Sequence, residues 1–141
     1  MVPDVDPSIG RKRKAQYSFA DYKRLYNRLR RLYFMDPGED FHVPPLAEEL
    51  KWYWCPPQAG ALGMSLFDED GDPTDIGFDP STRSSYHILR YVMLHEMTHM
   101  RIGPKWSCGA LSHRWYGARV ARNTLWYAET KRLVDLGALT L

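Results

Sequence analysis

The sequence His-Glu-Met-Thr-His at residues 95–99 contains the residue types and the spacing of a catalytic zinc site. Residues four apart lie on the same face of a helix, so His95 and His99 would present both imidazoles to one point. Glu96 would lie beside that point, where its carboxylate can reach a water molecule on the metal. The motif therefore predicts a zinc centre that hydrolyses peptide bonds, with Glu96 as the general base.

A catalytic zinc has three protein ligands and one open position, so a third ligand is expected downstream. The candidates are His113, Glu129 and Asp135. His113 is preferred because the break at Gly103-Pro104 lets the chain fold back before Ser112, which is a good N-cap for a helix starting near residue 113. Glu129 would instead lie more than four turns into that helix, and it stays the alternative.

The motif needs a helix that is apolar on one side. Ser84 or Ser85 is a suitable N-cap, and a helix is predicted from about Tyr86 to Arg101, ending at Gly103-Pro104. The positions expected on its inner side are Leu89, Val92, Met93 and Met100. Of the other histidines, His42 is expected to be exposed, and His87 lies two turns before the motif.

Three further elements are predicted around this helix. A first helix begins at Ser18, with Asp21 completing a capping box, and ends by Pro37-Gly38. Its apolar stripe is Tyr22, Leu25, Tyr26, Leu29, Leu32 and Tyr33. A hairpin follows, in which apolar residues alternate over residues 62–66 and 76–78 around an acidic turn. A short helix at residues 46–51 is possible, with residues 52–54 closing over the core, and a last helix runs from His113 to Leu136 and ends at Gly137.

Composition and charge narrow the class of protein. The 141 residues are enough for one domain, and no apolar run reaches the roughly 20 residues that span a bilayer. The N-terminal residues have no apolar signal-peptide region, and two cysteines do not form a secreted disulfide framework. We therefore expect a cytoplasmic protein, in a cell or, for a viral gene, in its host.

The net charge of +2 conceals blocks of +8 over residues 11–31, −10 over residues 36–79 and +7 over residues 83–132. The basic blocks could contact a polyanion or neutralise the acidic block.

The order of these features resembles the SprT-like metallopeptidases, the Spartan type of zincin or minigluzincin-like domain. The resemblance rests on the basic first helix, the hairpin ending in IGFDP, the segment LRYVMLHEMTHM and the segment SHRWYG, and it covers roughly residues 18–126. It implies an α+β zincin-like domain, His113 as third ligand and action on DNA-associated proteins. The chain departs from the family in having Arg114 directly after His113 and in lacking a four-cysteine zinc ribbon.

We therefore expect a disordered basic arm at residues 1–16 and a single α+β domain at residues 17–141, with three main helices and a small antiparallel sheet. The predicted ligands of one zinc ion are His95, His99 and His113, with Tyr116 as a possible oxyanion helper. An extended peptide or protein substrate would lie along the edge of the hairpin. Membrane association is not expected. The possible nucleic-acid contacts are Arg11, Lys12, Arg13, Lys14, Arg24, Arg28 and Arg31. The alternative is a zinc-containing binding or virion-associated protein without turnover.

Overall fold

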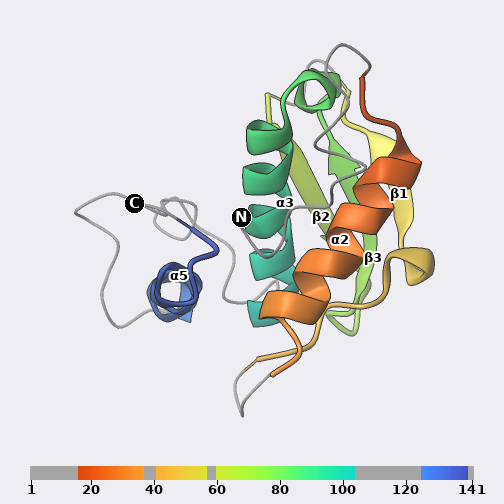
Figure 1. Ribbon diagram of the computed structural model, residues 1–141. Helices are drawn as coiled ribbons and strands as arrows, with labels where there is room; N and C mark the ends of the chain where they lie inside the picture. Colours follow the sequence, from red (N-terminus) through yellow and green to blue (C-terminus); the bar gives the residue numbers. More distant parts are fainter. Residues whose placement is uncertain (1–15, 37–40, 57–59, 104–124, 140–141) are drawn as a thin grey trace.

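The computed structural model describes residues 16–36, 41–56, 60–103 and 125–139, and it has the predicted α+β architecture (Figure 1). Three helices and a three-stranded sheet form the described part of the chain, together with two short 3₁₀ segments. In chain order the elements are α2 (Phe19–Tyr33), η1 (Ala47–Glu49), β1 (Lys51–Trp54), β2 (Gly63–Phe67), β3 (Pro73–Phe78), η3 (Pro80–Ser84), α3 (Tyr86–Ile102) and α5 (Leu125–Asp135).

The predicted hairpin is present as β2 and β3, which pair antiparallel. A third strand, β1, pairs parallel to β3, so the sheet is mixed, with the strand order β1-β3-β2. The sequence indicated a possible helix over residues 46–51, but only Ala47–Glu49 is helical, and β1 follows at Lys51–Trp54. The alternation of Trp52 and Trp54 with Tyr53 suits a pleated strand because both tryptophans then join the core on one face.

Helix α2 begins where the sequence predicted. The Ser18 side chain accepts a hydrogen bond from the Asp21 N–H, and the Asp21 carboxylate accepts one from the Ser18 N–H at 2.9 Å. This capping box satisfies donors that the first turn leaves without partners. The predicted stripe faces the core, except that Leu32 is 40% exposed.

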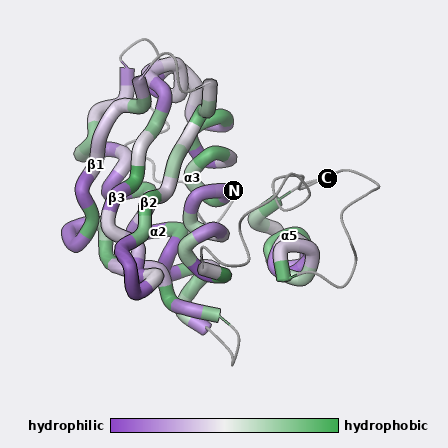
Figure 2. Tube along the Cα trace, turned by 180° about the vertical axis from the view of Figure 1, so that it is seen from behind, coloured by the Kyte–Doolittle hydropathy of each residue, from purple (hydrophilic) through white to green (hydrophobic). Residues whose placement is uncertain are grey.

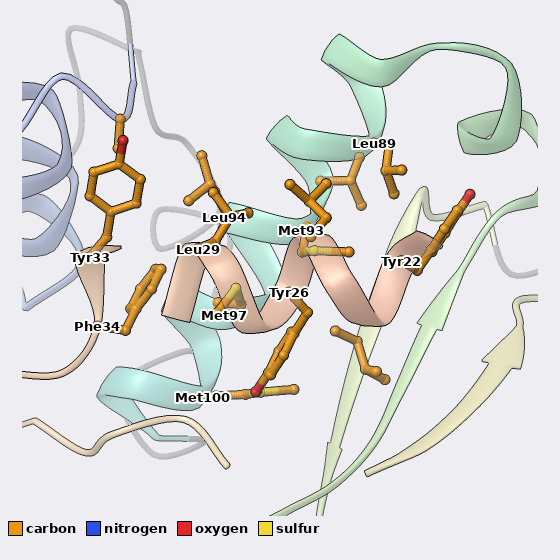
Figure 3. Close-up of a cluster of buried hydrophobic side chains, with 14 of the residues drawn as sticks. Tyr22, Tyr26, Leu29, Tyr33, Phe34, Leu89, Met93, Leu94, Met97 and Met100 are labelled. Carbon is orange, nitrogen blue, oxygen red and sulfur yellow. The ribbon is translucent and has the colours of Figure 1, made fainter. Parts of the chain in front are cut away.

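The core lies between the sheet and the two helices α2 and α3, which both cover the same face of the sheet (Figures 1 and 2). Tyr22 packs edge-on against Phe78 of β3, with ring centroids 4.9 Å apart. Tyr26 and Met100 meet farther along the same interface, where the Tyr26 hydroxyl also donates to the Pro45 carbonyl at 2.6 Å (Figure 3). Aromatic rings thus fill much of the hydrophobic core.

Helix α3 carries the motif and lies between the sheet and α5. Ser85 caps its N-terminus by accepting from the Ile88 N–H, and Gly103 ends it with φ of 83°. The four positions predicted to face inward are all buried. From residue 96 to residue 102 every side chain is buried, so this half of α3 is enclosed on all sides.

Helix α5 lies beside the C-terminal half of α3 (Figure 1). Gly137, with φ of 79°, follows the helix, and the Ala138 N–H donates back to the Leu133 carbonyl at 2.8 Å, as in a Schellman end. The predicted helix end at Gly137 is thereby confirmed, whereas the predicted start near His113 lies outside the described residues.

Among the described residues, no helix has the length and apolar content needed to cross a membrane.

We expect the capping box of α2 to contribute measurably to stability. Replacing Ser18 by Ala removes the acceptor for the Asp21 N–H and should lower the free energy of unfolding by about 1 kcal/mol. Urea unfolding followed by circular dichroism measures this loss. Ser84→Ala, which removes an exposed serine hydroxyl from η3, is the control and should change the free energy of unfolding by less than about 0.5 kcal/mol. Equal stability of Ser18→Ala and the wild type would contradict this account of the cap.

Candidate metal centre

His95, Glu96 and His99 form a group that could hold a metal ion. One ligand atom from each of these residues lies within 4.8 Å of the other two, and no other group of this kind occurs in the described ranges 16–36, 41–56, 60–103 and 125–139. Helix α3 brings the two imidazoles together because residues four apart stack on one face. His95 is partly exposed and His99 is buried, so the pair lies at the border between solvent and the interior.

The spacing of the two ring nitrogens fits zinc. His95 Nε2 and His99 Nε2 are 3.2 Å apart. Two nitrogens that are each about 2.0–2.1 Å from a tetrahedral zinc ion are about 3.3–3.4 Å from each other. Two adjacent imidazoles without a metal could also share one proton in a hydrogen bond, but that arrangement places no requirement on a neighbouring carboxylate. Two imidazole nitrogens at this spacing suit zinc or a similar transition metal, and the Glu96 carboxylate lies beside them.

Strand β2 supports the carboxyl group of Glu96, which is only 4% exposed. The Ser65 Oγ lies 2.8 Å from Glu96 Oε1 and 3.2 Å from the Glu96 main-chain oxygen. A serine hydroxyl has one hydrogen, so it donates to the nearer carboxylate oxygen. A Cβ on Gly63 would lie 2.9 Å from Glu96 Oε2 and 2.7 Å from Val92 Cγ1, so only glycine leaves room for the carboxylate there.

Burial sets the proton affinity of Glu96. Loss of hydration raises the pKa of its carboxyl group to about 7, while the hydrogen bond from Ser65 acts in the opposite direction. A carboxyl group with such a pKa exchanges a proton readily near neutral pH.

Trp126 of α5 covers the two histidines from another side. Its ring centroid is 5.1 Å from that of His95, at an interplanar angle of 68°, and 4.8 Å from that of His99, at 43°. Trp126 is 1% exposed, so it excludes water from one side of the imidazole pair. Trp126 falls within the last helix predicted from the sequence, but its contact with the motif was not predicted.

Glu129, the alternative third ligand, is engaged elsewhere. Its Oε1 lies 2.9 Å from Arg101 Nε and accepts a hydrogen bond from Arg132 Nε at 2.9 Å. Arg101 is also buried, and its Nη2 donates to the Asp36 carbonyl at 2.6 Å. Glu129 is therefore absent from the group around the histidines and instead neutralises a buried guanidinium group. Desolvation lowers the pKa of Arg101, and the charge of Glu129 opposes that effect.

The remaining predicted residues divide into three sets. Asp135 is exposed and pairs with Lys131 at 3.1 Å, and His42 and His87 are exposed away from the motif. His113, Tyr116 and the basic residues of the arm, 11–14, lie outside the described residues. On α2, Arg24 and Arg31 are exposed, whereas Arg28 is partly buried. The structure thus brings together His95, Glu96 and His99, and excludes Asp135 and Glu129 from their group.

Comparison of the chain with models of known protein families, with curated proteins and with solved structures found no match. The resemblance to SprT-like peptidases therefore stays a prediction that rests on motif and order.

The third ligand can be identified by exchanging the two candidates separately. We expect His113→Ala to lower the zinc-to-protein ratio well below that of the wild type, because two histidines do not make a tight site. Glu129→Ala should leave this ratio unchanged but lower the free energy of unfolding by about 3–5 kcal/mol, since Arg101 would lose its buried partner. Plasma emission spectrometry of dialysed protein gives the ratio.

Glu129→Gln serves as the milder variant, because an amide still accepts a hydrogen bond from Arg101. Loss of zinc in Glu129→Gln, with zinc retained in His113→Ala, would assign the third ligand to Glu129 instead.

Proposed function

We propose that this chain is a zinc-dependent peptidase whose centre is built on His95, Glu96 and His99. The observation that carries the proposal is the combination of two Nε2 atoms 3.2 Å apart with a buried, hydrogen-bonded carboxylate in the same group. A structural zinc site is closed by four protein ligands and needs no neighbouring acid. A hydrolytic site needs three ligands and a base, and this group offers two histidines as ligands and Glu96 as the base.

Each residue has a distinct role in the proposed reaction. His95 and His99 hold the ion as neutral imidazoles, and His113 is proposed as the third ligand. Zinc, when bound, supplies Lewis acidity, which polarises a carbonyl group and makes water a nucleophile near neutral pH. Glu96 takes the proton from the attacking water and later delivers it to the leaving amine. Tyr116 is retained as a possible helper for the oxyanion.

Strand β2 offers a place for an extended substrate. It lies at one end of the strand order β1-β3-β2, so its outer backbone groups face no other described strand. Ser65 on this strand reaches Glu96, which places the strand directly beside the proposed centre. A peptide that adds to β2 as another strand would run past the carboxylate, and its main chain would be recognised largely independently of its side chains.

A zinc-binding protein without turnover is the alternative. That protein would bind zinc through the same histidines but would gain nothing from Glu96 as a base. The SprT-like resemblance adds a possible association with DNA-bound substrates. Arg24 and Arg31 are exposed on the outer side of α2 and could contribute to a phosphate-binding surface together with residues 11–14.

Substitution of Glu96 distinguishes a peptidase from a zinc-binding protein without turnover. We expect Glu96→Gln to lower the peptidase rate by about two orders of magnitude or more, the scale of a lost acid–base group, with zinc still bound. Casein hydrolysis and metal content, measured on the same preparation, test this. Glu69→Gln in the exposed turn is the matched control and should keep full activity. Full activity of Glu96→Gln would end the proposal, and an inactive wild type that binds zinc would favour the alternative.

Association with DNA predicts a strong dependence on salt. If residues 11–14 contact phosphates, replacing all four by Ala should weaken binding to unrelated DNA sequences to a similar extent and reduce the salt slope of the affinity. Mobility shifts at several salt concentrations measure both effects. Lys131→Ala, which removes an exposed charge from α5, is the control. The absence of any complex at low salt would refute DNA binding.

A further inference from the structure

Strand β2 holds the Glu96 carboxyl group from two sides. Gly63 and Ser65 are two residues apart, so they point to the same face of the sheet, and both contact Glu96 on α3. Gly63 leaves room for Oε2 and Ser65 donates to Oε1. We propose that Ser65 is the residue that positions Glu96 for the reaction, with Gly63 providing the space.

The need for such a residue follows from the flexibility of glutamate. Its carboxylate is separated from the helix by three rotatable bonds, and a helix face alone does not select one arrangement of them. A shift of about 1 Å in a reacting group can lower a rate about 100-fold. The Ser65 hydroxyl fixes one carboxylate oxygen, while other lone pairs of the carboxylate stay available for a proton from water.

The polarity of the strand supports this assignment. Of the large apolar residues of β2, Met64 and Leu66 lie on the other face of the sheet, where Leu66 is 42% exposed. The small residues Gly63 and Ser65 thus occupy the face that packs against α3, where a strand would ordinarily place its bulky side chains. A larger residue at position 63 would push β2 away from α3, since a Cβ there would already approach Val92 Cγ1 to 2.7 Å.

This inference rests on the proposed function, and its first test does not need turnover. In metal-free protein, Ser65→Ala should raise the unfolding equilibrium constant about tenfold, the effect of losing a hydrogen bond to a charged group. In the Glu96→Leu background the same exchange should change the constant by less than about threefold, because the acceptor is gone. Urea unfolding of the four proteins gives this double-mutant cycle. Equal effects in both backgrounds would overturn the inference.

The second test concerns the reaction. Ser65→Ala should lower kcat about 10- to 100-fold, with KM and zinc content near their wild-type values, because neither substrate binding nor the ligands are changed. Ser65→Thr keeps a hydroxyl and should recover most of kcat. Ser84→Ala, an exposed serine of η3, should match the wild type.

The outcomes separate the inference from the proposed function. A wild-type kcat in Ser65→Ala, alongside a strong loss in Glu96→Gln, would overturn the role of Ser65 and leave the peptidase proposal intact. Wild-type protein that shows no Glu96-dependent hydrolysis would overturn the peptidase proposal and, with it, the role of Ser65 in turnover. Coupling in the first test together with a selective loss of kcat in the second supports both.

Discussion

The C-terminal half of α3 is buried on all sides, and each polar group that it carries has to find a partner inside the protein. An unpaired polar group in the interior costs roughly 1–3 kcal/mol, and an unpaired charge costs more. Glu96, Thr98, His99 and Arg101 all fall in this buried stretch. Much of the surrounding structure can be understood as the set of partners that these four residues require.

Two of the four find partners within α3, and the other two find partners on other elements. The Thr98 hydroxyl donates to the Leu94 carbonyl within the helix at 2.7 Å, and His99 meets His95 one turn earlier. Glu96 is bonded by Ser65 of β2. Arg101 requires Glu129 of α5 and the carbonyl of Asp36, and its guanidinium group also lies over the Phe41 ring at 4.8 Å.

The Arg101–Glu129 pair has a consequence for the motif. It attaches α5 to the end of α3, and Trp126 lies one turn before Glu129 on the same helix. Residues three apart share a helix face, so the helix that brings Glu129 to Arg101 also brings Trp126 to the imidazoles. A buried ion pair is weak evidence for stability, but here it specifies where the helix lies.

Local rules explain why much of the fold could be predicted from sequence. Several features depend only on residues within five positions of each other. These are the helix caps at Ser18 and Ser85, the helix end at Gly137 and the grouping of His95, Glu96 and His99. The partners of Glu96 and Arg101 are 31 and 28 residues away, and no periodicity identifies them. Strand β1 was missed because its identity depends on pairing with β3, which lies more than 20 residues later.

The inward-facing side of β2 could not be predicted from the sequence pattern alone. The apolar residues correctly predicted a strand, but period-2 alternation does not say which face is turned inward. The buried carboxylate of Glu96 decides it, because it requires a hydrogen-bond donor and space on the face toward α3. A pattern that marks Ser65 as a solvent-facing position therefore conceals a residue of the site.

The site that results is lined by an apolar side chain on one side and by polar groups on the other. Trp126 is apolar and covers the imidazoles, whereas β2 presents a small residue and a hydroxyl group to the carboxylate. An apolar wall keeps water away from the ligand side and lowers the local dielectric constant, which strengthens interactions between charged groups there. A polar wall keeps the carboxylate hydrogen-bonded within the same interior. This separation lets one turn of a helix carry two imidazoles and a buried acid side by side. It makes the partners of α3 as necessary to the proposed chemistry as the motif itself.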